Sequence, residues 1–108
     1  MTLRPIEFNI LLALAAEERH GYAIMQEVAR FSEGALSLEA GTLYRALHRM
    51  LKSGWVAESA RRPAADVDDE RRRYYRLTPL GRRVAAAEAE RLARLVSAAR
   101  AHRLLSRA

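Results

Sequence analysis

The chain has 108 residues, no cysteine and a formal net charge of +6. This length fits one domain with a modest core, and the lack of cysteine excludes a disulfide framework and a thiolate metal site. All of the 19 Lys and Arg residues except Lys52 are arginines, whose planar guanidinium suits phosphates and the edges of bases. Nucleic acid is therefore the predicted partner class.

An acidic membrane surface is the rival partner for so basic a chain. No apolar run approaches the roughly 20 residues of a membrane-spanning helix, and the N-terminus has no basic segment followed by an apolar core and a cleavage site. We therefore predict a protein of the cytoplasm with no membrane partner, which the absence of cysteine fits.

Two short helices are predicted in the first third of the chain. The first begins at Pro5, which suits the first turn of a helix, and runs to Ala16. The pattern then breaks, and a second helix runs from Gly21 to about Phe31, after which Gly34 permits a sharp reversal. The apolar face of the first helix comprises Ile6, Ile10, Leu11 and Leu14. The buried side of the second comprises Ile24, Val28 and Phe31.

The stretch from residue 37 to residue 54 predicts a third helix with two chemically different faces. Ser37 is the predicted N-cap, and Gly54 stands where a left-handed residue would end the helix. One face is apolar and consists of Leu43, Leu47, Met50 and Leu51. The other face is cationic and consists of Arg45, His48, Arg49 and Lys52. Solvated charges on a surface helix would give the same pattern, but the surrounding order of helix, turn, helix and ribbon favours a binding face.

Two strand-like runs follow, Trp55 to Ser59 and Arg73 to Leu77, which we interpret as an antiparallel pair. Their connection, residues 60–72, has no strong hairpin dipeptide and predicts a long, mobile loop. Its cluster of carboxylates, Asp66 to Glu70, lacks the glycine and the spacing of a calcium loop, so we expect it to be hydrated.

One long helix is predicted from Thr78-Pro79, an N-cap followed by a proline, to roughly Leu105. At 1.5 Å per residue it would be about 40 Å long, which is more than the small body beside it can cover. A short heptad seam of mostly small residues predicts that the helix mediates homodimerisation. The seam consists of Ala85, Ala89, Leu92, Val96 and Ala99.

No arrangement of residues in the sequence indicates catalysis. There is no recognisable motif of nucleophile, base and orienting group, and no glycine-rich phosphate loop. The histidines His20, His48 and His102 lie on different segments, with no second ligand at metal spacing beside any of them. We therefore expect that the protein is not an enzyme and binds no metal or cofactor.

Three motifs, in this order, resemble the PadR family of bacterial transcriptional regulators: H-G-Y-A-I (20–24), G-T-L-Y-R-A-L (41–47) and R-R-Y-Y-R-L-T-P-L-G (72–81). The resemblance implies a mainly α fold with a small β-ribbon. A winged helix-turn-helix DNA-binding domain would span residues 1–78, and a single C-terminal dimerisation helix would span 79–108, as in the short subfamily. It also implies that the protein represses a promoter, and that a small-molecule effector or another signal ends this repression.

The resemblance, together with the cationic face, implies a set of DNA-binding residues. They are Tyr22, Thr42, Tyr44, Arg45, His48, Arg49, Arg71, Arg72 and Arg73. The chain departs from the family at the wing, where the loop of residues 63–70 is long and has an acidic tip. The acidic tip argues against its insertion into the minor groove of DNA. No aromatic residue follows Tyr75, so a drug site that stacks on the last helix is not predicted.

Two functions are consistent with this sequence. The first is sequence-specific binding of a palindromic operator by a homodimeric repressor, with the third helix in the major groove of double-stranded DNA. The alternative is a winged-helix module whose basic face binds an acidic protein surface. Salt-dependent binding to a duplex of preferred sequence would distinguish the two.

Overall fold

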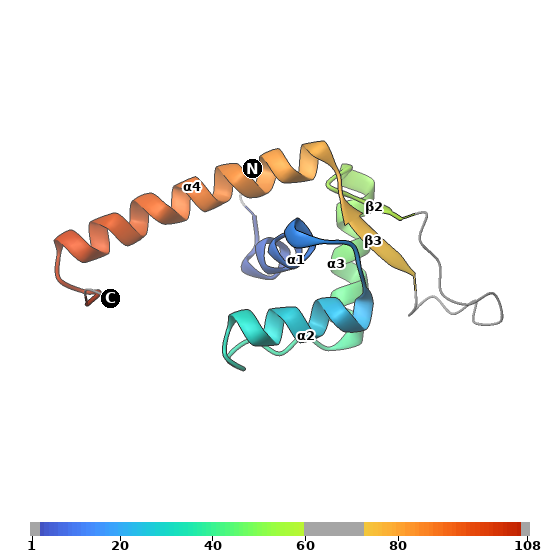
Figure 1. The fold of residues 1–108 in the computed structure, drawn as a ribbon, viewed down its shortest axis with the longest axis horizontal. Helices are drawn as coiled ribbons and strands as arrows, with labels where there is room; N and C mark the ends of the chain where they lie inside the picture. Colours follow the sequence, from blue (N-terminus) through green and yellow to red (C-terminus); the bar gives the residue numbers. More distant parts are fainter. Residues whose placement is uncertain (1–2, 60–72, 107–108) are drawn as a thin grey trace.

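The computed structural model of the protein describes residues 3–59 and 73–106. Three helices and a small sheet form the body, and a long C-terminal helix lies across it and projects beyond it (Figure 1). The elements in chain order are α1 (Pro5–Ala16), β1 (Arg19–His20), α2 (Gly21–Phe31), α3 (Ala40–Ser53), β2 (Val56–Glu58), β3 (Tyr74–Leu77) and α4 (Pro79–Ala101). The predicted mainly α fold with a β-ribbon is confirmed, and the molecule extends over 55 × 27 × 21 Å.

The sheet has three strands in the order β1-β3-β2, with both pairs antiparallel. Val56 pairs with Leu77, so the predicted ribbon exists, although both strands are shorter than predicted. The first strand was missed, because its two residues carry no strand pattern and it is defined only by pairing with β3, where Arg19 lies opposite Tyr75. The segment between α1 and α2 therefore forms a strand, β1, only because it pairs with β3, which lies much later in the sequence.

The core lies between α1, α2, α3 and one face of the sheet. Its largest fully buried side chains are Ile10, Leu11, Ile24, Val28, Leu43, Leu47, Met50 and Val56. Trp55 and Tyr75 extend this core onto the sheet. The prediction that Phe31 is buried was wrong, since it is 36% exposed at the last position of α2. There its ring lies under the guanidinium of Arg30, 5.1 Å from the ring centroid.

The third helix begins two residues later than predicted. Its N-cap is Glu39 and not Ser37, and no side chain caps it. The preceding segment stays non-helical because Leu38 is buried in the core and the amide of Leu36 donates to the Ser32 hydroxyl at 2.9 Å. The predicted end is confirmed: Gly54 is left-handed at φ 79°, and its amide donates to the last turn of α3.

The start of α4 is fixed by the residues that the sequence predicted. The Thr78 hydroxyl accepts a hydrogen bond from the amide of Gly81 at 3.0 Å, and Pro79 occupies the first helical position. A Cβ at Gly81 would lie 1.9 Å from the carbonyl oxygen of Trp55, so only glycine lets α4 pack this closely on the end of the ribbon.

The end of α4 was predicted too far along the chain. The helix stops at Ala101 rather than near Leu105. Arg103 adopts φ 62°, in the left-handed region, and the amide of Leu104 bonds back to the carbonyl of Ala99 at 2.8 Å. This is a helix-ending geometry formed without glycine, which explains why no stop signal is visible in the sequence.

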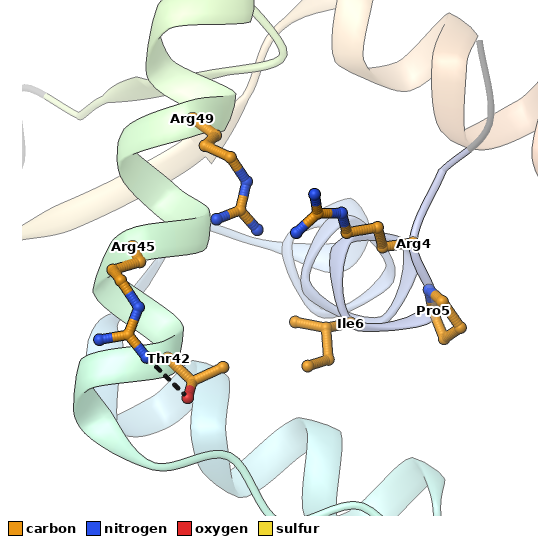
Figure 2. Close-up of a pocket in the computed structure, with 6 residues that line it drawn as sticks. All are labelled: Arg4, Pro5, Ile6, Thr42, Arg45 and Arg49. Carbon is orange, nitrogen blue, oxygen red and sulfur yellow. Dashed lines mark hydrogen bonds between the residues drawn. The ribbon is translucent and has the colours of Figure 1, made fainter.

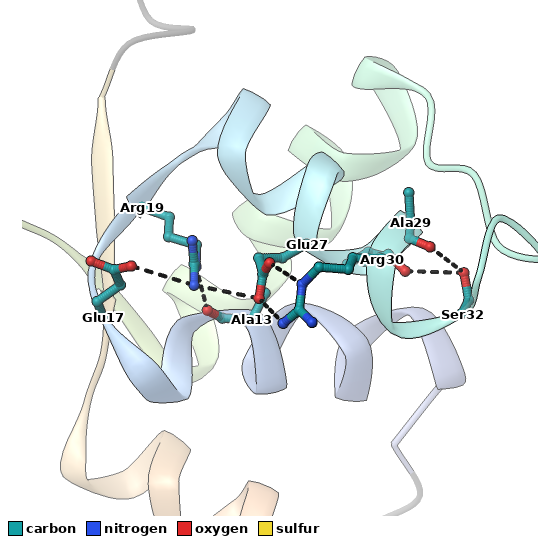
Figure 3. A network of polar contacts seen from close by, with 8 residues as sticks. Ala13, Glu17, Arg19, Glu27, Ala29, Arg30 and Ser32 are labelled. Carbon is teal, nitrogen blue, oxygen red and sulfur yellow. Dashed lines mark hydrogen bonds and ion pairs between the residues drawn. The ribbon is translucent and has the colours of Figure 1, made fainter.

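A network of charged side chains joins α1, β1 and α2 on the outside of the body (Figure 3). Arg19 donates to the carbonyl of Ala13 at 2.8 Å and lies 3.5 Å from Glu17 and 3.4 Å from Glu27. Glu27 in turn receives two hydrogen bonds from Arg30, at 2.7 and 2.9 Å. These bonds lower the pKa of the Glu27 carboxyl and raise the pKa of Arg30.

Candidate nucleic-acid interface

The two predicted faces of α3 are both present. Leu43, Leu47 and Met50 are buried, while Arg45 and Arg49 on the other side are exposed. His48 and Lys52 are exposed on the same outer face. The helix therefore holds its cationic stripe in solvent by anchoring the opposite stripe in the core.

The start of α2 is packed closely against α3. A Cβ at Gly21 would lie 2.4 Å from the Tyr44 hydroxyl oxygen, so the missing side chain makes room for that ring. The Nδ1 atom of His20 accepts a hydrogen bond from the amide of Ala23 at 3.2 Å and caps the helix. Tyr22, in this first turn, is 60% exposed, so a predicted DNA contact projects into solvent beside α3.

A hollow of about 570 Å³ separates α3 from the beginning of α1. Figure 2 shows Thr42, Arg45 and Arg49 on one side of it and Arg4, Pro5 and Ile6 on the other. Arg45 folds back along its own helix and donates to the Thr42 hydroxyl at 3.4 Å. Thr42, Arg45 and Arg49 belong to the predicted set of DNA-binding residues, and Arg4 does not.

A buried carboxylate contacts Arg49, one of the residues that line this hollow. Glu7 is only 7% exposed; its Oε1 accepts a hydrogen bond from the backbone amide of Arg4 at 3.0 Å, and its Oε2 lies 3.5 Å from Nε of Arg49. One side chain thus connects the start of α1 to the basic face of α3. The only sequence signal for it was an acidic residue in the first turn of a helix, which is the usual place for a capping carboxylate.

The wing is described only at its base. Arg71, Arg72 and the acidic stretch 63–70 lie outside the described residues. Arg73 is exposed, and its Nη1 lies 3.3 Å from Oε1 of Glu58 across the ribbon. The base is tied to the body by a hydrogen bond from the Ser59 hydroxyl to Glu18 and by an edge contact between Tyr74 and His20.

The side chains of the predicted dimerisation seam are half-buried or exposed along α4. Ala85 packs against the core, and Leu92 is half-buried near Leu3 and Phe8. Ala89 is exposed, and Ala99 is half-buried. Val96 is 39% exposed, and its neighbour Leu95, which the seam did not include, is 54% exposed. The second half of the helix therefore carries apolar side chains that the described residues leave in solvent.

Two negative findings concern only the residues that the structure describes. Among residues 3–59 and 73–106, no group of three His, Asp or Glu side chains is placed to hold a metal ion. In the same ranges, no helix is both long enough and apolar enough to cross a membrane.

The order of helix, strand, two packed helices and antiparallel ribbon, with a basic exposed face on the third helix, defines a winged helix-turn-helix. The sequence pattern of the Transcriptional regulator PadR-like family matches residues 10–87. The chain belongs to this family of transcriptional regulators, and the resemblance seen in the three motifs is confirmed.

Individual relatives agree with this assignment. The Transcriptional regulator Rv3488 of Mycobacterium tuberculosis is 34% identical over 100 residues, which cover 90% of this chain and 87% of the relative. A PadR family transcription regulator from Clostridium difficile has a TM-score of 0.72 at 24% identity, with 90% of this chain and 96% of that chain covered. Bacillus subtilis PadR in complex with operator DNA has a TM-score of 0.67 at 20% identity, with 80% and 47% covered. These two structures establish the fold.

Proposed function

We propose that this transcriptional regulator is a homodimeric repressor that binds a palindromic operator with α3 in the major groove. The observation that carries the proposal is the exposed row of basic side chains on α3, opposite a stripe that is buried in the core. Bacillus subtilis PadR, which shares the fold, is seen with operator DNA. Such a protein acts in the cytoplasm, and a small-molecule effector or another signal would end repression.

Arg45 is the proposed reader of bases. Because α3 begins at Ala40, Arg45 lies in its second turn, near the N-terminal end. The N-terminal end of a recognition helix is the part that usually contacts base edges. An arginine can bind guanine through two hydrogen bonds, which is worth about 1 to 3 kcal/mol of discrimination. Thr42 and His48 flank it on the same helix.

The remaining predicted residues are proposed to hold the DNA backbone. Phosphate contacts fix the orientation of a protein on the duplex without reading sequence. Tyr22 and Tyr44 would do so at the start of α2, where the hydroxyl of Tyr44 already lies close to the helix. Arg49 on α3 and the arginines 71–73, which the family resemblance implies are DNA-binding, would also bind phosphates.

Dimerisation is proposed to use α4. Residues 1–78 would bind DNA and residues 79–108 would join two copies of the protein, so that the two α3 helices of the dimer face the two half-sites of the operator. The exposed Leu95 and Val96 provide apolar surface for a second copy. The two-fold symmetry of such a dimer is what makes a palindromic operator the expected target.

The experiment is selection of bound sequences from a random duplex pool, followed by a salt titration on the selected duplex and on a scrambled one. The proposal expects an enriched palindrome, and an affinity that falls linearly with salt on a double logarithmic plot. Absence of any enriched sequence, together with binding to an acidic protein surface, would favour the alternative of a protein-interaction module.

A further inference from the structure

Three guanidinium groups surround the hollow beside α3. Arg45 and Arg49 belong to α3, Arg4 immediately precedes α1, and Figure 2 shows the side chains of Arg4 and Arg49 extending toward each other. Within the described part of the chain, the carboxylate that contacts them is that of Glu7, which balances one of the three positive charges. The hollow therefore carries an excess of positive charge.

The Glu7 carboxylate links the backbone of Arg4 to the side chain of Arg49 on the other side of the hollow. Glu7 binds the backbone of Arg4 with one oxygen and Nε of Arg49 with the other. Because Glu7 uses only Nε, the two terminal nitrogens of Arg49 are left for another acceptor. The guanidinium of Arg4 has no hydrogen bond or ion pair to any residue in 3–59 or 73–106. Two like charges that line the same hollow favour binding of an anion between them.

We propose that Arg4 and Arg49 grip one phosphate of the DNA backbone in this hollow, an inference that rests on the proposed function. The hollow opens beside Thr42 and Arg45 on the exposed face of α3, so a duplex lying on that face would bring its backbone alongside. The planar forks of two arginines match the oxygens of a phosphate. Arg4 is then a positioning residue that extends the DNA contact from α3 to the start of α1.

The test compares Arg4→Ala with the unmodified dimer on a mixed-sequence duplex, for which no operator is needed. Arg4→Ala leaves the backbone hydrogen bond to Glu7 in place, so the fold should persist, as circular dichroism would verify. Arg30→Ala is the matched control, because it removes the same charge from the exposed last turn of α2. The measured quantity is the slope of log affinity against log salt.

The proposal expects Arg4→Ala to reduce the magnitude of this slope by about 0.9 for each bound subunit, while Arg30→Ala keeps the slope. Arg4→Lys should restore part of the affinity, since it returns the charge without the fork. A slope unchanged by Arg4→Ala, in a protein that does bind DNA, overturns this inference alone. Failure of the unmodified protein to bind any duplex would instead overturn the proposed function.

Free inorganic phosphate could bind the same arginines in place of a phosphate of the DNA backbone. Thermal unfolding in sodium phosphate and in sodium chloride, at equal ionic strength, measures how much the hollow favours that ion. If phosphate stabilises the unmodified protein more than Arg4→Ala, and Arg4→Ala still keeps the full DNA slope, the hollow binds free phosphate and the DNA contact is wrong. Loss of slope in the variant supports the DNA contact.

Discussion

The Oε2 atom of Glu7 lies 3.5 Å from Nε of Arg49, so a buried carboxylate of α1 holds an arginine on the exposed face of α3. The two residues are 42 positions apart in the sequence. The same carboxylate also accepts the backbone amide of Arg4. A group of this kind couples the stability of the helical body to the arrangement of its basic surface.

Glu7→Ala is expected to destabilise the protein by about 1 to 3 kcal/mol, because it leaves the amide of Arg4 without its partner and opens a gap at the start of α1. The measurement is the free energy of unfolding from urea titration. The control is Glu17→Ala, since Glu17 is exposed and surface changes usually stay within about 0.5 kcal/mol. Equal stabilities of the two variants would contradict the structural role of Glu7.

Much of the fold could be predicted from the sequence, because its signals are local. Proline in the first turn marks α1, Thr78-Pro79 marks α4, and the periodicity of apolar residues identifies the buried face of α3. The errors lie where tertiary contacts decide. Burial of Leu38 delays the start of α3, and the left-handed Arg103 ends α4 without a glycine.

The candidate site was predictable only in part, for the same reason. The basic face of α3 follows from helical spacing, but no local pattern connects Arg4 or Glu7 with Arg49. That contact exists because the fold brings Glu7 of α1 to Arg49 of α3, although the two residues are 42 positions apart in the sequence. The sequence shows an acidic residue in the first turn of α1, but it holds no local sign of the second partner of that residue.

Gly81→Ala should destabilise the protein by about 1 to 3 kcal/mol, since the added Cβ would meet the carbonyl oxygen of Trp55 at 1.9 Å. The sign is informative, because glycine to alanine inside an unhindered helix stabilises by up to about 1 kcal/mol. Ser97→Ala, on an exposed turn of the same helix, serves as the control. A thermal midpoint raised by Gly81→Ala would refute the close packing of α4 on the ribbon.

The ion pair of Glu27 predicts a specific dependence of stability on pH. Its hydrogen bonds from Arg30 lower the folded-state pKa below the ordinary value of 4.5. The pair therefore contributes its stability above the unfolded-state pKa, and this contribution is lost as the pH falls through the folded-state pKa. In urea titrations, Glu27→Gln should be less stable than the unmodified protein at neutral pH, and the difference should shrink in acid. A difference that stays constant down to strong acid would exclude this role.

The proposed dimer predicts different effects at two positions of α4. Val96→Asp should give a folded monomer, because Val96 is partly exposed on its own chain and an aspartate there would face the apolar surface of the partner. Leu92→Asp should impair folding as well, since Leu92 is half-buried against the start of α1. The measurements are native mass and circular dichroism at micromolar concentration. An unmodified protein that is monomeric at that concentration would refute dimerisation.

The last prediction separates the residue that reads bases from those that hold phosphates. Arg45→Ala should reduce the preference for the selected duplex over a scrambled one, because its side chain lies near the start of α3, where recognition helices meet base edges. Arg72→Ala, in the arginine run 71–73 that the family resemblance implies is DNA-binding, should weaken binding to both duplexes alike and reduce the magnitude of the salt slope by about 0.9 for each lost contact.

Both variants are titrated with salt on both duplexes, so that each yields a ratio of affinities and a slope. Solvated arginines with no role would leave both quantities near those of the unmodified protein. The hydrogen bond from Arg45 to Thr42, at 3.4 Å, is long, so its loss should cost little stability and the variant should stay folded. If Arg45→Ala keeps the full ratio while Arg72→Ala loses slope, the protein binds DNA as proposed, but another side chain on α3 reads the sequence.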